Sequence, residues 1–383
     1  MRSTPVERTR AQLLTVARAG LDTPTFVAAT LETVARAVPF SAACLATTDP
    51  ATRLVTSAFK AGTMSSVDAA EDARWAFHEY VADDLYDYRD LLTREGAVMT
   101  THVETHGDPL RSSRFENFFQ PTWSVTDELR SAATADGDLW AFLALFRDEN
   151  GRTRTFNEAE MEFVSSIATT VARGVRASLV TTLVAAGPGG VATGAGPGVL
   201  LVDAAGEVLS ANGEAHDRIA ALGGGSLGST PLPMPVQSVV NAAQRFGRGQ
   251  EHWAPRVRMR TVSGRWVVVS ASPMTSFGAG VPSTTAVTVE DAGATDVLPL
   301  VVAAHGLTGR EREVVRLVLR GVSTAEIGRA LHLSAYTVQD HLKAVFDKVG
   351  VRSRRELAAR VFAEEYVPRM GAGGSPGASG FFA

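Results

Sequence analysis

Three start signals for helices lie within about fifty residues after Leu307. In each, a Ser or Thr precedes a Glu by three residues, so hydroxyl and carboxylate can both accept hydrogen bonds from unpaired amides at a helix start. The pairs are Thr308 with Glu311, Ser323 with Glu326, and Ser353 with Glu356. Gly321 and Gly350 stand where helices end in a left-handed residue. This spacing predicts four short helices, at about 309–320, 324–331, 335–349 and 354–365.

Apolar residues recur at helical spacing along these segments and predict a common inward face. Its members are Val314, Leu317, Val318, Ile327, Leu331, Leu333, Val338, Leu342, Val345 and Leu357. The short turn "LHLS" between the second and third helices sets them at a steep angle, which is typical of a helix-turn-helix. A helical dimerisation or docking bundle that does not bind DNA would have the same pattern.

The third predicted helix carries a polar stripe opposite its apolar row, made of Tyr336, Gln339, Asp340, Lys343 and Asp347. A helix in the major groove presents such a stripe to base edges. Gln339 can pair with adenine, and Lys343 can reach guanine or a phosphate. Asp340 can accept a hydrogen bond from cytosine N4, pair with an Arg, or simply be solvated. For Asp347 we expect solvation.

The run from Leu307 to Leu357 resembles the C-terminal DNA-binding domain of the LuxR/NarL family of transcription regulators. The matching residues are Leu307, Thr308, Arg310, Glu311, Glu313, Val314, Gly321, Ser323, Glu326, Ile327, Leu331, Leu333, Ser334, Thr337, Val338, His341, Leu342, Lys348, Gly350, Val351, Ser353, Arg354, Glu356 and Leu357. The resemblance implies an all-α four-helix domain at 301–367 that binds double-stranded DNA through a helix-turn-helix at 324–343. It also implies a homodimer that pairs through the last helix, Arg354–Ala363.

The expected DNA-contacting residues follow from this placement. They are Ser323, Thr324, Ser334, Tyr336, Thr337, Gln339, Asp340 and Lys343, with Arg352, Arg354 and Arg355 as phosphate anchors. The family often has Lys or Arg where this chain has Gln339, so the departure predicts a different base preference.

The distribution of charge supports a DNA-binding function at the C-terminal end. The whole chain has a formal net charge of −4, with 37 Lys and Arg against 41 Asp and Glu. Residues 301–370 hold 12 of the basic and 8 of the acidic residues, which is +4, so the remainder is −8. Because +4 is a modest charge, we expect affinity to come from dimers on two half-sites.

The segment 8–185 resembles a GAF domain in the order of its predicted elements. "SAACLATTDPATRLVTSAF" is typical of two strands joined by a turn, and "DGDLWAFLALFRDENGRT" of a buried strand. A long helix follows, which Asn157 and Glu160 start with a capping pair. Tyr80, Tyr86, Tyr88, Phe115, Phe118, Phe119 and Trp123 could line a ligand pocket or form the core.

Residues 198–292 resemble a PAS domain, because two strands, a helical region and three strands follow one another. Gly206 suits the turn between the first two strands, and Asn212 is placed to cap a short helix. Gly- and Pro-rich stretches predict a linker at 186–197 and a disordered tail at 371–383. The predicted fold class is therefore multidomain, with two α+β modules and an all-α domain.

Several other classes of protein and site are disfavoured. Cys44 is the only cysteine, which excludes an intrachain disulfide and cysteine-based zinc sites, and it lies on a predicted core strand. The sequence lacks a signal-peptide core and any apolar run of about 18 residues, so we expect a cytoplasmic protein without membrane contact. His102 and His106 have the i, i+4 spacing of a metal pair, but without a third ligand we expect a solvated loop.

Two common sensory domains of this family do not fit. No lysine occurs between Lys60 and Lys343, which removes the lysine that a phosphorylated receiver domain needs. "GPGGVATGAGPG" lacks the Lys-Ser/Thr pair of a nucleotide-binding loop.

The sequence thus predicts a homodimeric DNA-binding regulator without catalytic residues, metal or cofactor, whose GAF/PAS-like half responds to a signal, a partner or a small-molecule ligand. The alternatives are a sigma-factor-like promoter-recognition protein and a sensory enzyme with a helical docking domain.

Overall fold

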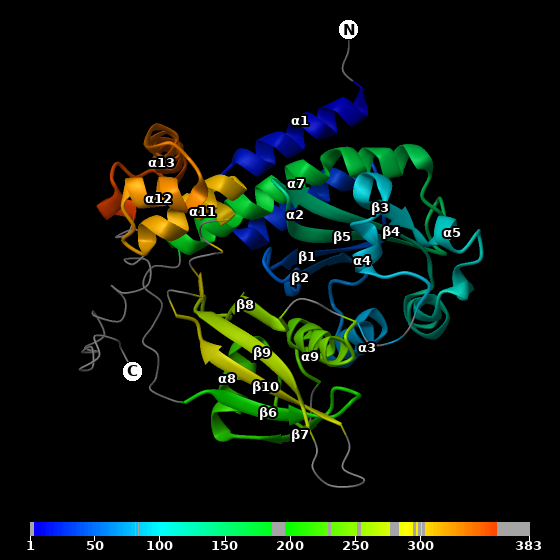
Figure 1. Cartoon of the computed structure of the whole chain (residues 1–383). Helices are drawn as coiled ribbons and strands as arrows, with labels where there is room; N and C mark the ends of the chain where they lie inside the picture. Colours follow the sequence, from blue (N-terminus) through cyan, green and yellow to red (C-terminus); the bar gives the residue numbers. More distant parts are fainter. Residues whose placement is uncertain are drawn as a thin grey trace. The chain divides into compact units, whose positions relative to one another are not determined.

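The computed structural model describes residues 4–80, 82, 84–185, 196–228, 231–250, 254–275, 283–293, 296–297, 300 and 303–357. The chain forms two compact units (Figure 1). The first comprises Met1–Thr182 with Ala195–Asp291, and the second comprises Leu183–Gly194 with Ala292–Ala383. The predicted tail, most of the predicted linker and residues 358–365 of the fourth predicted helix lie outside the described residues. In the described part, every helix is too short or too polar to cross a membrane.

The first unit begins with an antiparallel five-stranded sheet in the order β2-β1-β5-β4-β3. Its strands are β1 (Ala42–Thr48), β2 (Val55–Gly62), β3 (Val98–Thr100), β4 (Val125–Ala135) and β5 (Asp138–Asp148). The predicted hairpin β1–β2 and the buried strand β5 are confirmed, with Leu45 opposite Leu143 in the register. Strand β4 was not predicted, because Asp127, Glu128 and Arg130 interrupt its apolar pattern although all three are buried.

Helices cover both faces of this sheet (Figure 1). The longer ones are α1 (Pro5–Arg18), α2 (Thr23–Ala35), α3 (Ala69–Tyr80) and α7 (Glu158–Ala185); short turns are α4 (Tyr88–Leu91), η1 (Glu95–Ala97), α5 (Thr101–Glu104), η2 (Pro109–Arg111), η3 (Phe115–Phe119) and α6 (Gln120–Trp123). The predicted capping pair starts α7, since the amides and side chains of Asn157 and Glu160 exchange two hydrogen bonds of 3.0 Å. Gly174 brings α7 against α2, because a Cβ there would lie 2.2 Å from the ring of Phe26.

A second antiparallel sheet in the same unit has the order β7-β6-β10-β9-β8. Its elements are β6 (Gly198–Val202), β7 (Val208–Ala211), α8 (Gly213–Ala221), α9 (Met234–Gly247), β8 (Arg256–Arg260), β9 (Trp266–Met274) and β10 (Thr284–Asp291). The predicted order of two strands, helices and three strands is confirmed. Gly206 has φ +88° in the β6–β7 turn, and Asn212 accepts the amide of Ala215 at 3.1 Å to cap α8.

Polar contacts join the two sheet regions within the first unit. Asp49, at the end of β1, accepts a 2.7 Å hydrogen bond from Nε of Arg258 on β8, and both side chains are buried. Arg245 on α9 donates to the carbonyl of Tyr80 at the end of α3 at 2.8 Å. A buried ion pair between segments about 200 residues apart fixes their relative position, because removing the partner of a buried charge is strongly destabilising.

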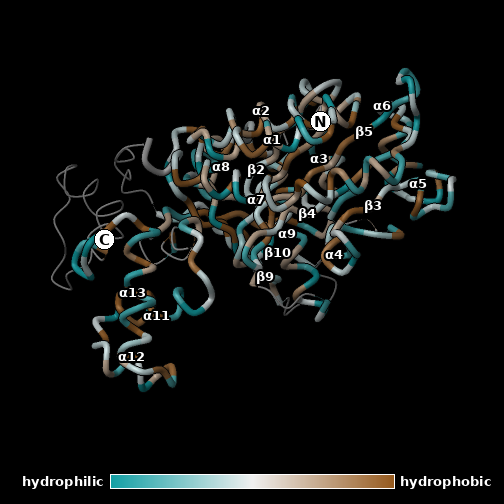
Figure 2. The backbone as a smooth tube through the Cα atoms, turned by 90° about the horizontal axis from the view of Figure 1, so that it is seen from above, coloured by the Kyte–Doolittle hydropathy of each residue, from teal (hydrophilic) through white to brown (hydrophobic). Residues whose placement is uncertain are grey.

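The second unit contains α11 (Gly309–Leu319), α12 (Thr324–Leu331), α13 (Ala335–Val349) and a helical start at 354–357. Hydrophobic and hydrophilic residues alternate along these helices (Figure 2). The predicted inward residues all belong to its core cluster, with Leu317, Leu331 and Leu333 partly buried. Leu307, Val315, Val349 and Val351 are further buried members of that core. The first three predicted helices are confirmed to within a residue or two at each end.

Candidate nucleic-acid interface

Two of the three predicted capping boxes form in full. The Thr308 hydroxyl accepts the amide of Glu311 at 3.3 Å, and the Glu311 carboxylate accepts the amide of Thr308 at 2.7 Å. Ser323 and Glu326 form the same reciprocal pair at the start of α12. The local sequence therefore fixes where α11 and α12 begin.

The third capping box forms in a modified way. The Ser353 hydroxyl accepts the amide of Glu356 at 3.0 Å as predicted. The Glu356 carboxylate, however, accepts the amide of Arg352 at 2.7 Å, one residue before the expected partner. The predicted reciprocal bond to Ser353 is thus replaced by one that protects the preceding amide.

The turn between α12 and α13 depends on a close backbone approach. His332 ends α12 in the left-handed region with φ +54°, and Leu333 donates its amide to the carbonyl of Gly328 at 2.8 Å. A Cβ at Gly328 would lie 2.7 Å from the Leu333 carbonyl oxygen. Ser334 then caps α13 by accepting the amide of Thr337 at 3.0 Å. These contacts build the predicted helix-turn-helix.

Helix α13 has one buried side and one exposed side, as predicted. Val338, Leu342 and Val345 are at most 2% exposed. On the other side Tyr336 is 76% exposed, and Gln339, Asp340, Lys343 and Asp347 are also exposed. The core therefore leaves the polar stripe open to solvent, while the base-reading role of its residues stays a prediction.

Lys348 has a structural role that the sequence pattern did not reveal. Its Nζ lies 2.6 and 2.9 Å from the two carboxylate oxygens of Glu311, which ties the end of α13 to the start of α11. Burial alone would raise the pKa of Glu311, but hydrogen bonds from Lys348 and Thr308 lower it below its usual value. A carboxylate held in its charged form strengthens this contact.

Arg354 joins the start of the fourth helix to the start of α12. Its guanidinium donates to the carbonyl of Val322 at 3.1 Å and to the hydroxyl of Thr324 at 2.8 Å. Arg354 and Thr324, two candidate DNA-contacting residues, therefore contact each other, and Arg354 is half-buried. Arg352 and Arg355 are exposed beside it, and the phosphate-anchoring role of the three arginines stays a prediction.

Comparison with known proteins identifies this region. Residues 305–361 match the family described as bacterial regulatory proteins, luxR family. Spore germination protein GerE of Bacillus subtilis is 40% identical over 55 residues, which are 14% of this chain and 74% of that protein. The chain belongs to the LuxR family of bacterial regulatory proteins.

The chain spans only a small part of another relative of the LuxR family. A helix-turn-helix-type transcriptional regulator of Mycobacterium bovis is 49% identical over 51 residues, which are 13% of this chain and only 6% of that protein. Among solved structures, the phage VqmA–DPO complex aligns with 17% identity and a TM-score of 0.20, over 44% of this chain and 83% of that one. A TM-score this low supports no conclusion about the first unit.

The other residues considered in the sequence lie in the first unit. Cys44 is 5% exposed and burial raises the pKa of its thiol to about 12, so it is a core residue as predicted. His102 lies in the short helix α5, whereas His106 follows it with φ +54° and is outside the helix. Among the described residues, no three His, Cys, Asp or Glu side chains are grouped as metal ligands.

The candidate aromatic residues divide between a core and a cavity. Phe115, Phe118 and Phe119 are fully buried in a cluster with Trp75 and Phe146, against which Trp123 packs. Tyr80, Tyr86 and Tyr88 line a cavity of about 540 Å³. The core interpretation is therefore confirmed for Phe115, Phe118 and Phe119, and a ligand-binding role for the tyrosines stays a prediction.

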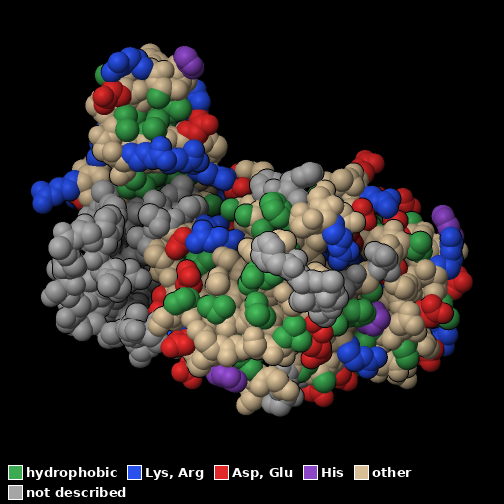
Figure 3. All heavy atoms as spheres, turned by 60° about the horizontal axis from the view of Figure 1, so that its bottom comes forward, with side chains coloured by type: hydrophobic (Ala, Val, Ile, Leu, Met, Phe, Trp, Pro, Cys, Tyr) green, Lys and Arg blue, Asp and Glu red, His purple; other side chains and the backbone are tan. Residues whose placement is uncertain are grey.

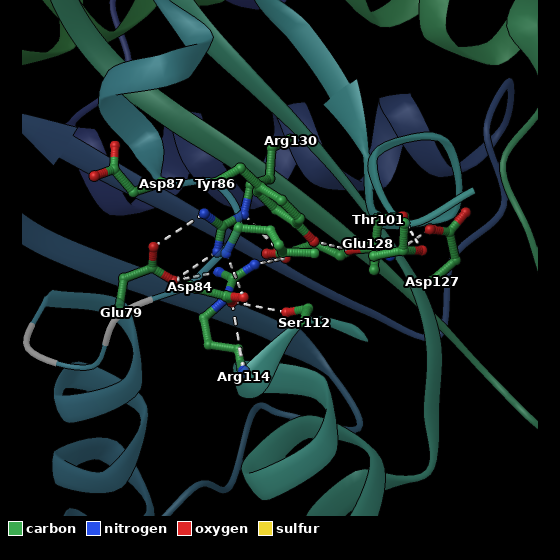
Figure 4. Close-up of polar contacts among 12 residues, drawn as sticks. Glu79, Asp84, Tyr86, Asp87, Thr101, Ser112, Arg114, Asp127, Glu128 and Arg130 are labelled. Atoms are coloured by element: carbon green, nitrogen blue, oxygen red, sulfur yellow. Dashed lines mark hydrogen bonds and ion pairs between the residues drawn. The ribbon is translucent and has the colours of Figure 1, made fainter. Parts of the chain in front are cut away.

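A buried ion cluster that the sequence did not predict lies beside this cavity (Figure 4). Arg114 and Arg130 are 1% exposed and lie between the carboxylates of Glu79, Asp84 and Glu128. Within β4, the charges in "DELR" between apolar residues were the available signal. Arg130 pairs with Glu79 on α3 and Glu128 with Arg114 just before η3, at sequence distances that no local pattern covers.

Proposed function

We propose that this LuxR-family chain is a cytoplasmic DNA-binding transcriptional regulator whose helix α13 enters the major groove. The single observation that carries this proposal is the exposed polar stripe of α13, held outward by a fully buried row of Val338, Leu342 and Val345. Helices placed in this way after a tight turn read base edges with their first turns. Neither the sigma-factor-like alternative nor the sensory-enzyme alternative is favoured by any observation.

The exposed residues divide into readers and anchors. Gln339 and Lys343 carry the donors and acceptors that base edges recognise. Arg354 contacts the start of α12, and Arg352 and Arg355 are its exposed neighbours in sequence. The three supply positive charge for phosphates, which positions the domain without selecting a sequence. Arg354 can also contribute to phosphate binding indirectly. Its hydrogen bond to Thr324 orients the start of α12, whose backbone amides can face a phosphate.

We propose that the chain binds DNA as a homodimer on two half-sites. The net charge of +4 over residues 301–370 is small for a monomer that has to displace counterions on its own. In the view of Figure 3, acidic and basic side chains are intermixed on the surface of the molecule. The proposed pairing helix, Arg354–Ala363, extends beyond the described residues.

For the first unit we propose a GAF-like region followed by a PAS-like region, which together supply the regulatory input through a ligand or a partner. Support comes from the two antiparallel sheets, whose strand orders correspond when each sheet is numbered from its own first strand. The long closing helix α7 fits the GAF-like layout, and α8 and α9 between β7 and β8 fit the PAS-like one.

The test is selection of DNA sites from a random duplex library by the full-length protein, followed by titration of the selected site at several salt concentrations. We expect a linear fall of log affinity with log salt, because phosphate contacts release counterions. Gln339→Ala should relax the preference at one base-pair position, whereas Asp347→Ala, an exposed change on the same helix, should not. Binding that selects no sequence, or a selected site that Gln339→Ala reads unchanged, would refute the placement of α13.

A further inference from the structure

The first unit contains a cavity of a size suited to a small molecule. Its volume is about 540 Å³, within the range of roughly 300–1,000 Å³ that ligand sites occupy. One part of the wall comes from Tyr80, which ends α3, and from Tyr88, which begins α4. Another part comes from α9, with Asn241 and Gln244. Because its lining comes from both sheet regions of this unit, the cavity lies between them.

The formal charges of the lining are close to balanced. Among the described residues, the lining holds four arginines and three carboxylates, namely Arg53, Arg114, Arg245 and Arg248 with Glu79, Asp84 and Asp87. Arg114 is buried and lies 2.7 Å from Glu79 and 3.1 Å from Asp84. A charged ligand at these groups would have to break buried ion pairs, which is strongly unfavourable. The charges of the lining therefore belong to contacts within the protein.

The other basic groups of the lining do not select an anion. Arg53 and Arg248 are exposed, so water and salt screen their charge. Arg245 donates a 2.8 Å hydrogen bond to the carbonyl of Tyr80. Burial and nearby arginines lower the pKa of His78, which favours its neutral form. We therefore expect an uncharged ligand.

Asn241 is a buried amide whose side chain has no partner within the described part of the protein. It is 4% exposed and lines the cavity from α9. No described residue forms a hydrogen bond with its side-chain oxygen or nitrogen. An amide withdrawn from water without hydrogen bonds costs folding free energy, and nearly all buried polar side chains have a partner. A ligand in the cavity would supply the missing hydrogen bonds.

Other uncharged hydrogen-bonding groups of the lining are available beside this amide. Burial raises the pKa of Tyr80 and of Tyr88 well above the usual value for a phenol, so both hydroxyls stay neutral. Neither hydroxyl forms a hydrogen bond with a described residue. Gln244 donates its Nε2 to the carbonyl of Asp203 at 3.4 Å, which leaves its Oε1 as an acceptor. The cavity thus offers donors and acceptors that carry no charge.

Apolar side chains supply the remaining surface of the lining. The rings of Tyr88 and Phe142 pack against each other with their centroids 4.3 Å apart. Leu54 and Leu92 also line the cavity. Sites for small molecules combine apolar walls of this kind with a few polar groups that fix the orientation of the ligand. A flat apolar body therefore fits the same cavity as the polar groups of α9.

We propose that the cavity binds an uncharged, planar small molecule with an adjacent hydrogen-bond donor and acceptor, such as a carboxamide on an aromatic ring. The side chain of Asn241 pairs with such a group through two parallel hydrogen bonds, as asparagine does with the edge of adenine. The hydroxyls of Tyr80 and Tyr88 rotate to donate or accept as the ligand requires. This inference rests on the proposed function only in making the ligand the input of the regulator.

The first test compares four probes of nearly one shape on the full-length protein by equilibrium dialysis, with naphthalene fluorescence as the readout. Naphthalene-2-carboxamide is neutral with donor and acceptor, 2-acetylnaphthalene lacks the donor, 2-naphthoate is an anion and 2-naphthamidine is a cation. We expect the carboxamide to bind about tenfold more tightly than each of the others, because they leave buried polar groups unpaired or bring an unpaired charge. Equal binding of the four, tighter binding of either ion, or no binding of the carboxamide would overturn the proposal.

Variants of Asn241 locate the site. Asn241→Leu, a change of similar volume, should weaken carboxamide binding about tenfold. Without ligand its melting temperature should not fall, because the change removes a buried amide that has no partner in the protein. Asn150→Leu, an exposed change outside the cavity lining, should leave the affinity unchanged. Unchanged carboxamide affinity in Asn241→Leu, or a lowered melting temperature, contradicts the assigned role.

Asn241→Asp tests the same pairing by a change of preference. A carboxylate at this position can accept two charge-assisted hydrogen bonds from an amidinium, so 2-naphthamidine should now bind more tightly than the carboxamide. A variant that fails to fold cannot gain a ligand, and the four-probe comparison on the unmodified protein decides the question if neither variant folds. An unchanged order of affinities in folded Asn241→Asp contradicts the site. DNA binding without carboxamide binding refutes this inference alone, whereas the reverse result refutes only the proposed function.

Discussion

Replacing Gly328 by Ala tests the turn that orients α13. The new Cβ would lie 2.7 Å from the Leu333 carbonyl oxygen, a backbone atom that cannot rotate away. Alanine favours the helix by ~1 kcal/mol, whereas forcing extra volume into a packed site costs ~1–3 kcal/mol. We expect the upper end of that cost, because the turn must open and stretch the 2.8 Å hydrogen bond from Leu333 to Gly328. The predicted net loss of stability is ~1–2 kcal/mol.

Gly309→Ala is the matched control, since Gly309 is also helical and its substitution adds a Cβ with no neighbouring atom of the described residues within 4 Å. It should be neutral or stabilising by up to ~1 kcal/mol. Hydrogen exchange of the full-length protein, followed by mass spectrometry over α12 and α13, measures the difference locally. Gly328→Ala should lose protection there and bind DNA more weakly. Equal protection in the two variants would refute the close approach of the turn to α12.

Three further predictions concern the same domain. Because the pKa of Glu311 is lowered in the folded state, its contact with Lys348 stabilises the domain above about pH 4.5, and this stabilisation is lost as the pH falls through the folded-state pKa. Glu311→Gln should therefore flatten the pH dependence of stability in acid unfolding curves. An unchanged curve would contradict the role of this contact. Arg354→Ala should weaken binding to all DNA sequences about equally in titrations against single-base site changes, whereas Gln339→Ala should cost ~1–3 kcal/mol on the preferred site alone. Asp340→Ala should raise non-specific binding by removing a negative charge near phosphates; a simultaneous loss of selectivity at one position would identify Asp340 as a base acceptor, and no rise would place it away from the DNA.

The sequence by itself determined the C-terminal domain almost completely. Its helix starts depend on hydrogen bonds between residues three apart, such as Ser323 with Glu326, and its ends on glycines such as Gly350 with φ +70°. Contacts this local can be read from spacing alone. The inward face could be predicted for the same reason, because helical periodicity fixes which side chains share a side.

Tertiary structure alone decided which charged residues are structural. Lys348 and Arg354 lie in segments that the sequence assigns correctly, but their partners Glu311 and Thr324 are 37 and 30 residues away. The sequence could mark Arg354 as a cation near DNA, yet only packing shows that it also joins two helices.

The first unit depended still more on tertiary structure. Strand β4 was not predicted because its charges interrupt the apolar pattern, whereas the fold buries Arg130 against Glu79, 51 residues earlier. Burying a charge is favourable only when a partner is placed within hydrogen-bond distance, and that placement requires the folded sheet. The cavity is likewise invisible in the sequence, since its walls come from segments about 150 residues apart that only the packing of α9 beside α3 brings together.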